Sequence, residues 1–518
     1  MTRQERITAI GKLKPSTFNH WETKEPLAKN QMSYFIIPFA HEIYEKKKPC
    51  KTIKALGTLG WSVVNNKTKR ILSDTGDGRF MDSIKLYLYD EMVPKYEKIN
   101  EHFLLQKNII FQKNNLHKEW TFRSFLRGKV DFETKFSLDG LDLLIVDKHI
   151  AFFSIKTQLS LDDNSSVSDI SAKYNRNMRD FRNMYVDTQT YTFSNDEKAG
   201  VSVFEWLASL VRTDKECLLS ISDKTLVEIQ KKKEYYPIYN ASYNAKMITA
   251  MHVAEMEVDG EEIEPAFEDD LISVKIDGTS SLEEMPFLLA TTSELYPNKM
   301  WEGNEEYINE QIGNGQINIW KYWSGVVLHD SMAFFSIGDG GSAIVNSARN
   351  SYYFIYMLNL YAAYKVRYFE YELIDNEFIS IENIRSQFTD LQRLKNQYMC
   401  TELSSLFQPN VVHEAIKGAM KTDDMYDEVK DNIEATLEIT SRNTDIIVTA
   451  LVSIFTVGGM YFNQKMLTDF FDEHRWTAIG IAVVLASIIL ISVKKRSTII
   501  RLFGKFRNKF SLVSRMFD

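Results

Sequence analysis

Two uncharged apolar runs near the C-terminus constrain this chain more than any other feature. Residues 446–462 (IIVTALVSIFTVGGMYF) and residues 476–493 (WTAIGIAVVLASIILISV) contain no charged residue. A membrane-spanning helix needs roughly 20 predominantly apolar residues, with about 17 as the lower limit. Either run alone also fits a buried core helix. Because the two runs adjoin and a basic cluster follows at once, we expect a two-helix transmembrane hairpin over residues 445–493.

The charge distribution predicts the orientation of this hairpin. Residues 494–518 hold eight Lys or Arg and one acid, which leaves 54 bases and 69 acids in residues 1–493. Basic residues flank membrane helices on the cytoplasmic side, so both termini are expected in the cytoplasm. The N-terminal stretch has no apolar signal-peptide core. The tail alternates bases with Ile, Leu and Phe, which indicates an amphipathic helix on the cytoplasmic leaflet. We expect no direct nucleic-acid binding.

Polar residues follow one face of the first predicted span. With about 100° of rotation per residue, six positions lie within a sector of about 80°. They are Asp445, Thr449, Ser453, Thr456, Met460 and Asn463. One interpretation is that these side chains connect neighbouring helices. The other is that they line a water-filled pore, which requires a homo-oligomer because one hairpin cannot enclose a channel.

The end of the first run resembles the signature of the CorA-type divalent-cation channels. The signature loop here is Gly458, Gly459, Met460, Tyr461, Phe462 and Asn463. The family has Gly-Met-Asn contiguous, whereas Tyr461 follows Met460 here and Asn463 comes two residues later. A long cytoplasmic part, a helix entering the membrane, a short loop, a second span and a basic C-terminus are also similar to that family. The resemblance implies a pentamer in a bacterial inner membrane, and the interruption puts magnesium selectivity in doubt.

The combination of such a hairpin with a larger soluble domain is similar in architecture to one branch of that family, which is associated with type III CRISPR systems. The resemblance implies a defence effector that a nucleotide second messenger activates. The activators it implies are a conjugate of S-adenosylmethionine and AMP, or a cyclic oligoadenylate. No tightly bound cofactor is expected; a divalent cation is a further candidate, with no assigned metal ligands.

The predicted fold class is an α+β cytoplasmic domain followed by long stalk helices and the hairpin, in a CorA-like arrangement. We place the cytoplasmic domain at residues 1–375, with its CorA-like part from about residue 325. The stalk covers 376–444, the hairpin 445–493 and the basic tail 494–518. Strands are expected on both sides of Asp147-Lys148 within residues 141–159, and again within residues 325–338. Helices are expected over residues 350–369, from Ile381 to Tyr398, and over residues 423–443, with a turn at Pro409.

Three segments are candidates for binding an anionic ligand. Arg123, Arg127 and Lys129 lie among aromatic residues in TFRSFLRGK, for which the plainer interpretation is a solvated helix face. Arg176 and Arg179 form a similar group. Gly338, Asp339 and Gly340 follow a predicted strand and precede a helix, where backbone N–H groups can bind phosphate. A plain turn also explains this loop, since it lacks the lysine of a P-loop.

The sequence carries no recognisable catalytic signature, and we expect no enzyme. Residues 255–270 hold nine carboxylates and no base, which fits a hydrated loop or a divalent-cation sensor. Our leading hypothesis is a homo-oligomeric membrane channel gated by its cytoplasmic domain, used as an antiviral effector. A housekeeping Mg²⁺ or Co²⁺ transporter and a membrane-tethered ligand-binding protein without a pore are the alternatives.

Overall fold

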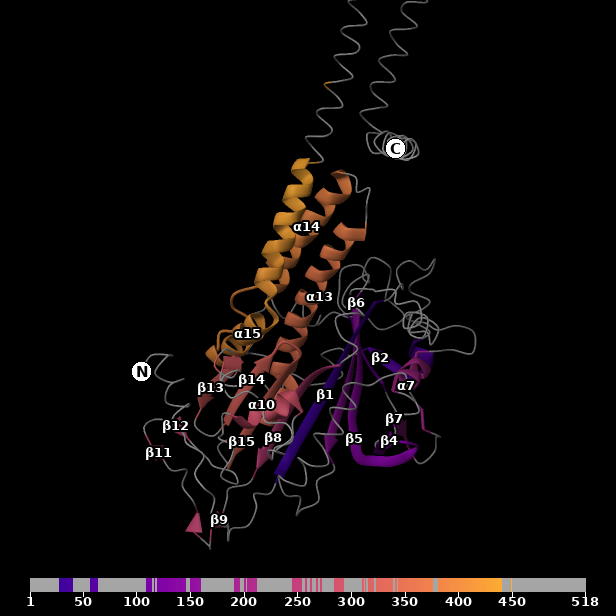
Figure 1. Ribbon diagram of the computed structural model, residues 1–518, viewed down its shortest axis with the longest axis vertical. Coiled ribbons are helices and arrows are strands. Elements are labelled where there is room, and N and C mark those ends of the chain that lie inside the picture. The colour runs from indigo at the N-terminus through magenta and orange to yellow at the C-terminus, as the bar shows by residue number, and fades with distance from the viewer. Residues whose placement is uncertain are drawn as a thin grey trace, which may run out of the picture. The chain divides into compact units, whose positions relative to one another are not determined.

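A long mixed β-sheet organises the part of the chain that the structure describes (Figure 1). This computed structural model describes residues 28–40, 56–63, 109–113, 116, 119–145, 150–159, 191–195, 200–201, 203–211, 245–253, 257–258, 261–262, 267–268, 271–272, 284–292, 310–311, 313, 315–320, 323–338, 341, 343–375, 381–439 and 449. The chain divides into two compact units, residues 1–368 with 394–425 and residues 369–393 with 426–518.

The sheet belongs to the first unit and has the strand order β13-β14-β15-β8-β1-β6-β5-β3-β2, with β4 and β7 branching from β5. Its strands are β1 (Ala28–Ala40), β2 (Trp61–Val63), β3 (Ile109–Lys113), β4 (Glu119–Leu126), β5 (Lys129–Ile145), β6 (Ile150–Leu159), β7 (Tyr191–Ser194), β8 (Lys246–Val253), β13 (Gln316–Trp320), β14 (Trp323–Leu328) and β15 (Ser331–Ile337). Among these pairings only β15 with β8 is parallel. Two short hairpins, β9 (Glu257–Val258) with β10 (Glu261–Glu262) and β11 (Phe267–Glu268) with β12 (Leu271–Ile272), lie outside the sheet.

Strand pairing confirms both predicted hairpins. β5 and β6 are antiparallel around residues 146–149, and β14 and β15 are antiparallel around His329 and Asp330. Their near-continuous apolar sequences suit strands buried on both faces, and Phe152, Phe153, Phe334 and Phe335 are all buried.

One face of the sheet is covered by α13 (Tyr353–Asp375), which continues from the π-helical turn η5 (Ala348–Tyr352) after α12 (Ala343–Ser347). Tyr353 contacts Tyr34 of β1, with ring centroids 5.5 Å apart, and Tyr364 contacts Phe152 of β6 at 6.1 Å. The predicted helix over residues 350–369 is therefore confirmed. The short helices α7 (Val203–Leu210) and α10 (Glu284–Thr291) complete the core, with α10 packed on β8, β14 and β15.

The C-terminal helices confirm the predicted periodicity but not the predicted turn. α14 (Ile381–Tyr398), α15 (Phe407–Met420) and a helix over residues 422–439 follow α13. Pro409 does not mark a turn: it lies in the first turn of α15, where a missing N–H removes no helical hydrogen bond. In the second unit, Ile384, Leu391, Val429 and Ile433 are buried, as their three- and four-residue spacings predict.

The predicted CorA-like fold class is wrong. The described residues form a mixed sheet of many strands with several helices, and residues on both sides of position 325 contribute to that sheet. Among the described residues, no helix is long and apolar enough to cross a membrane. The apolar sequence of α13, for example, is interrupted by Lys365, Arg367 and Glu370. Residues 445–493, on which the hairpin was predicted, lie outside the described residues except for Thr449.

Candidate functional site

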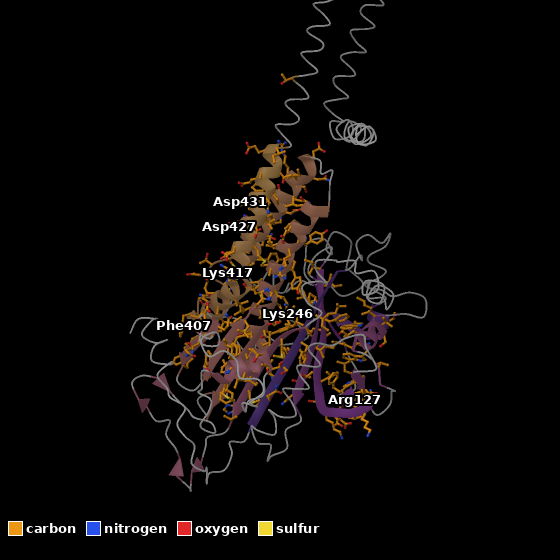
Figure 2. The ribbon with its side chains drawn as sticks, viewed as in Figure 1. Arg127, Lys246, Phe407, Lys417, Asp427 and Asp431 are labelled. Atoms are coloured by element: carbon orange, nitrogen blue, oxygen red, sulfur yellow. The ribbon has the colours of Figure 1, made fainter. Side chains whose placement is uncertain are left out.

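Arg123, Arg127 and Lys129 lie on a β-hairpin, not on a helix face. Leu126 pairs with Lys129 across a two-residue turn in which Arg127 and Gly128 both have positive φ, 51° and 76°. Two consecutive positive φ angles are typical of the type I′ turn that joins antiparallel strands. Figure 2 shows Arg127 at the tip of this hairpin. The hairpin itself therefore accounts for the glycine.

Arg123 already has partners within the sheet. Its Nε donates to the Glu133 carboxylate at 2.7 Å, and its Nη1 donates to the Ser194 hydroxyl at 2.9 Å. These contacts tie β4 to β5 and to β7. Because the guanidinium is neutralised by Glu133, Arg123 is a poor candidate for an added anion.

The glycine loop after β15 begins as a turn. Gly338 has φ 64° and donates its N–H to the Val253 carbonyl at 3.2 Å, and Gly341 N–H donates to the Gly338 carbonyl at 3.0 Å. Positive φ explains the glycine at 338. Asp339 and Gly340, together with Arg176 and Arg179, lie outside the described residues.

The predicted pore and signature residues fall almost entirely outside the described part of the chain. Asp445, Ser453, Thr456, Gly458, Gly459, Met460, Tyr461, Phe462 and Asn463 are not described, whereas Thr449 is helical and exposed. Their predicted roles stay predictions.

The structure reveals a charged cluster inside the sheet that the sequence did not indicate. Lys156 of β6 forms an ion pair with Asp142 of β5, and the two side chains are only 14% and 7% exposed. Gln112 of β3 donates from Nε2 to Asp142 Oδ1 at 3.3 Å. The Lys156 ammonium lies 4.8 Å from the ring centroid of Tyr353 and 5.4 Å from that of Tyr34. This Lys156 cluster therefore links four strands, β1, β3, β5 and β6, to α13.

The electrostatics keep the lysine of this cluster charged. Burial alone lowers the pKa of Lys156, but the Asp142 carboxylate and the oxygens of Tyr353 and Tyr34 together raise it above its ordinary value. Burial raises the pKa of Tyr353, partly opposed by Lys156. A lysine that stays protonated against one carboxylate is not a base or a nucleophile, so its role is to position α13 on the sheet.

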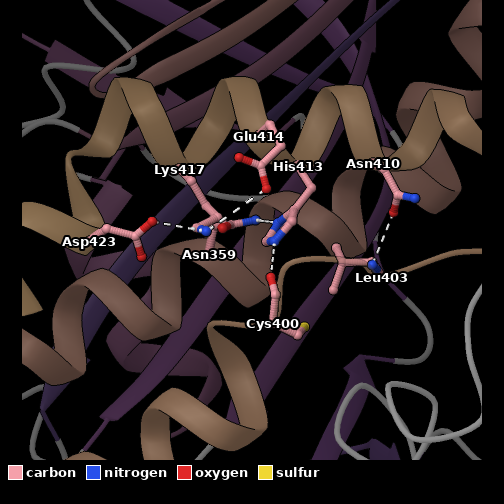
Figure 3. Close-up of polar contacts among 8 residues, drawn as sticks. All are labelled: Asn359, Cys400, Leu403, Asn410, His413, Glu414, Lys417 and Asp423. Carbon is pink, nitrogen blue, oxygen red and sulfur yellow. Dashed lines mark hydrogen bonds and ion pairs between the residues drawn. The ribbon is translucent and has the colours of Figure 1, made fainter.

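A second polar cluster joins α13, the connection over residues 399–406 and α15 (Figure 3). His413 is fully buried. The Asn359 amide Nδ2 donates to His413 Nδ1 at 2.9 Å, and His413 Nε2 donates to the Cys400 carbonyl at 2.8 Å. Because a carbonyl only accepts and the Asn359 amide nitrogen only donates, the imidazole is neutral with its proton on Nε2. This histidine junction fixes α15 against α13.

Further side-chain contacts hold the segment before α15 and the segment after it. Asn410 Oδ1 accepts the N–H groups of Leu403 and Ser404, both at 3.0 Å. Lys417 Nζ lies 3.0 Å from the Asp423 carboxylate and 3.9 Å from that of Glu414. Asp423 is in the first turn of helix 422–439, where a negative charge is favourable. The Lys417 contact therefore connects the histidine junction to the start of that helix.

The histidine junction predicts an acid-sensitive stability. Burial lowers the pKa of His413 from 6.5 to about 4, with a smaller contribution from Lys417 against the Cys400 carbonyl and Asp423. The unfolded chain therefore takes up the proton first as the pH falls. The stabilisation is complete above pH 6.5 and is lost as the pH falls towards 4, amounting to roughly 3 kcal/mol in the free energy of unfolding.

The measurement is the pH dependence of the unfolding free energy, for wild type and for His413→Gln, which keeps a hydrogen-bonding side chain without the titration. We expect the stability difference between the two proteins to shrink between pH 7 and pH 4. Parallel pH profiles would show that His413 does not titrate as its surroundings require.

Neither cluster offers a set of side-chain groups that are free to ligate a metal ion. Among the described residues, no group of three or more His, Cys, Asp or Glu is placed to hold a metal ion. The Lys156 cluster has one carboxylate, already paired, and the histidine junction uses both ring nitrogens of His413. Divalent-cation binding by residues 255–270 stays a prediction.

Comparisons of the chain with models of known families, with curated proteins and with solved structures gave no match. The similarity to the CorA-type channels stays a prediction that rests on residues 458–463 and on the order of segments.

Proposed function

We propose that this chain is a ligand-responsive protein that acts on a lipid bilayer as a homo-oligomer and permeabilises it. The sheet-bearing unit binds the ligand, and the C-terminal residues act on the lipid. The observation that carries the proposal is the order of segments along the chain. The buried histidine junction is followed by helix 422–439, then by the uncharged runs over residues 446–462 and 476–493, and then by the basic tail.

The helices supply a mechanical connection in this proposal. α13 begins on the sheet, where Tyr353 covers Lys156, and helix 422–439 begins beside α15, where Asp423 pairs with Lys417. A rearrangement of α13 on the sheet would act on Asn359 and His413, and through them on the start of helix 422–439. Packed interiors switch between discrete arrangements instead of deforming gradually, which favours a two-state response.

The runs and the tail have the chemistry that a bilayer requires. Uncharged apolar segments are transferred favourably from water to hydrocarbon, and the eight bases after residue 493 are attracted to anionic headgroups. We propose a small nucleotide as the ligand, which is the class that the resemblance implies.

The test is the release of a fluorescent dye from liposomes that contain the purified full-length protein, with and without adenine nucleotides and with and without Mg²⁺. We expect ligand-dependent release that Thr456→Leu and Asn463→Ala alter by roughly tenfold. Thr477→Leu, in the second run, is the matched control and is expected to leave release unchanged.

The outcomes separate the candidate functions. Release that depends on nucleotide supports the proposal. Flux of Mg²⁺ that no nucleotide affects would favour the transporter. Binding of nucleotide by inserted, oligomeric protein without any release would show a tethered binding protein and would contradict permeabilisation.

A further inference from the structure

A cationic cluster lies where the β14–β15 turn meets α13 and the end of α15. It consists of Lys246 at the start of β8, His329 in the turn, Arg367 on α13 and Lys421 after α15. All four residues belong to the first unit. Figure 2 shows Lys246 in the region between the strands and the helices, far from Arg127 at the hairpin tip.

Hydrogen bonds join β8, the turn and α13, and α15, which Lys421 follows directly, packs on β14. Met247 N–H donates to the Asp330 carbonyl at 3.2 Å, which ties the start of β8 to the turn. Arg367 donates from Nη2 to His329 Nε2 at 3.0 Å, and its Cζ lies 6.0 Å from the ring centroid of Tyr364. The guanidinium is thereby oriented by a histidine and an aromatic ring.

The charges of this cluster are not balanced. Burial lowers the pKa of His329, and the positive charges of Lys246, Arg367 and Lys421 lower it further, against Asp330 alone. Lys246 has an interaction partner of its own, so the positive charges that remain for a ligand are those of Arg367 and Lys421. Among the described residues, neither Arg367 nor Lys421 forms an ion pair with a carboxylate.

The unused groups are hydrogen-bond donors. Accepting at Nε2 leaves the His329 proton on Nδ1, and a guanidinium has five N–H donors of which one reaches His329. Lys421 is exposed, so its ammonium is available to solvent. Its backbone is in the left-handed region, with φ 52°. The next residue, Thr422, has a buried hydroxyl with no hydrogen-bond partner among the described residues. Donors and positive charge without carboxylate partners fit a phosphoryl group, for which arginine is the preferred ligand.

We propose that Arg367, His329 and Lys421 form a binding site for the phosphoryl group of a small anionic ligand. The site supplies the ligand-binding step of the proposed function. Only the effect of binding on the membrane rests on that function. Arg367 lies on the helix that covers the Lys156 cluster, and Lys421 lies directly before helix 422–439. A phosphoryl group bound by both therefore connects the two helices that the proposed function uses.

The test measures binding of inorganic pyrophosphate and of ATP to the full-length protein in detergent by isothermal titration calorimetry. The variants are Arg367→Gln and Lys421→Asn, since asparagine tolerates the left-handed backbone of residue 421. Each is expected to weaken binding of both probes roughly tenfold or more. The control is Arg393→Gln, an exposed arginine paired with Asp390 within α14, which is expected to change nothing.

A second arm distinguishes a soluble ligand from a lipid headgroup. Vesicles of phosphatidylglycerol and of phosphatidylcholine replace the soluble probes, and wild type is compared with the same variants. Loss of phosphatidylglycerol binding in Lys421→Asn, with no binding of pyrophosphate or ATP, assigns the phosphoryl group to a lipid. The site is overturned if Lys421→Asn binds all probes as wild type does. It is also overturned if wild type binds none of the probes.

Failure of the site and failure of the proposed function give different results. Dye release that persists unchanged in Arg367→Gln and Lys421→Asn would leave the membrane function in place and remove the site. Binding that the variants abolish, without any dye release from wild type, would keep the site and remove the membrane function. Thermal unfolding of each variant shows whether a loss of binding reflects a loss of fold.

Discussion

Replacing Lys156 with Met is expected to lower the free energy of unfolding by roughly 4 kcal/mol. The substitution leaves the Asp142 carboxylate buried beneath α13 without its cation, and among the described residues Gln112 is the donor that remains. It also removes the ammonium from the faces of Tyr353 and Tyr34. Chemical denaturation followed by circular dichroism measures the loss.

A double-mutant cycle shows whether the charge itself is needed. Asp142→Leu alone should destabilise by a similar amount, because Lys156 then lacks its partner, whereas the double variant with Lys156→Met should recover most of the loss. Arg393→Gln breaks a pair that is 61% and 48% exposed and should cost less than about 1 kcal/mol. Additive losses in the double variant would contradict a buried, mutually compensating pair.

The cycle also bears on the proposed response. Hydrophobic residues of similar volume often replace a buried ion pair without loss of stability. A double variant that is stable but no longer releases dye would therefore show that the pair sets the position of α13 for function. One that is stable and active would limit the pair to a structural role.

Sequence patterns were sufficient for local structure wherever neighbouring residues determine it. Alternating or continuous apolar runs located β5, β6, β14 and β15, and three- and four-residue spacings located α13, α14 and helix 422–439. Each of these signals arises within one element and its own buried face.

The order of strands was not predictable in the same way. β1 pairs with β6 and with β8, whose residues lie more than 100 and 200 positions away along the chain. Apolar faces of many strands fit one another equally well, so periodicity does not select partners. The sequence therefore did not predict the mixed sheet as a whole, although the elements around residue 325 were identified.

Two local errors have a simple physical origin. The sequence TFRSFLRGK is compatible with a helix face, but Arg127-Gly128 provides the two positive φ angles of a hairpin turn. Pro409 is compatible with a helix boundary, yet proline is well tolerated in the first turn of a helix. In both cases one residue type fits two different backbone conformations.

The two clusters depend on side-chain contacts between different elements, which the periodicity of a single element does not predict. Asp142 and Lys156 lie on either side of one predicted turn. The sequence signal for their ion pair was one charged residue within each of the two apolar strands. Arg367 and Lys421 carry no comparable signal, since single bases on helices are ordinarily exposed. Only their approach to His329 in the folded chain distinguishes them.

Gly315→Ala is expected to destabilise the protein by roughly 3 kcal/mol or more. A Cβ at this buried residue, just before β13, would overlap the carbonyl oxygen of Val327 and lie 3.2 Å from its carbonyl carbon. Val327 is in β14, between β13 and β15, and pairs with Met332. Because the clash is with backbone in the ladder, no side-chain rotation relieves it.

The matched control for this prediction is Gly418→Ala in α15. An added Cβ at Gly418 meets nothing within 4 Å, and alanine is favoured over glycine in a helix by about 1 kcal/mol. The two substitutions add the same methyl group, so thermal unfolding should show a large loss for Gly315→Ala and no loss, or a gain, for Gly418→Ala. Equal stabilities would mean that β13 does not approach β14 as closely as the structure shows.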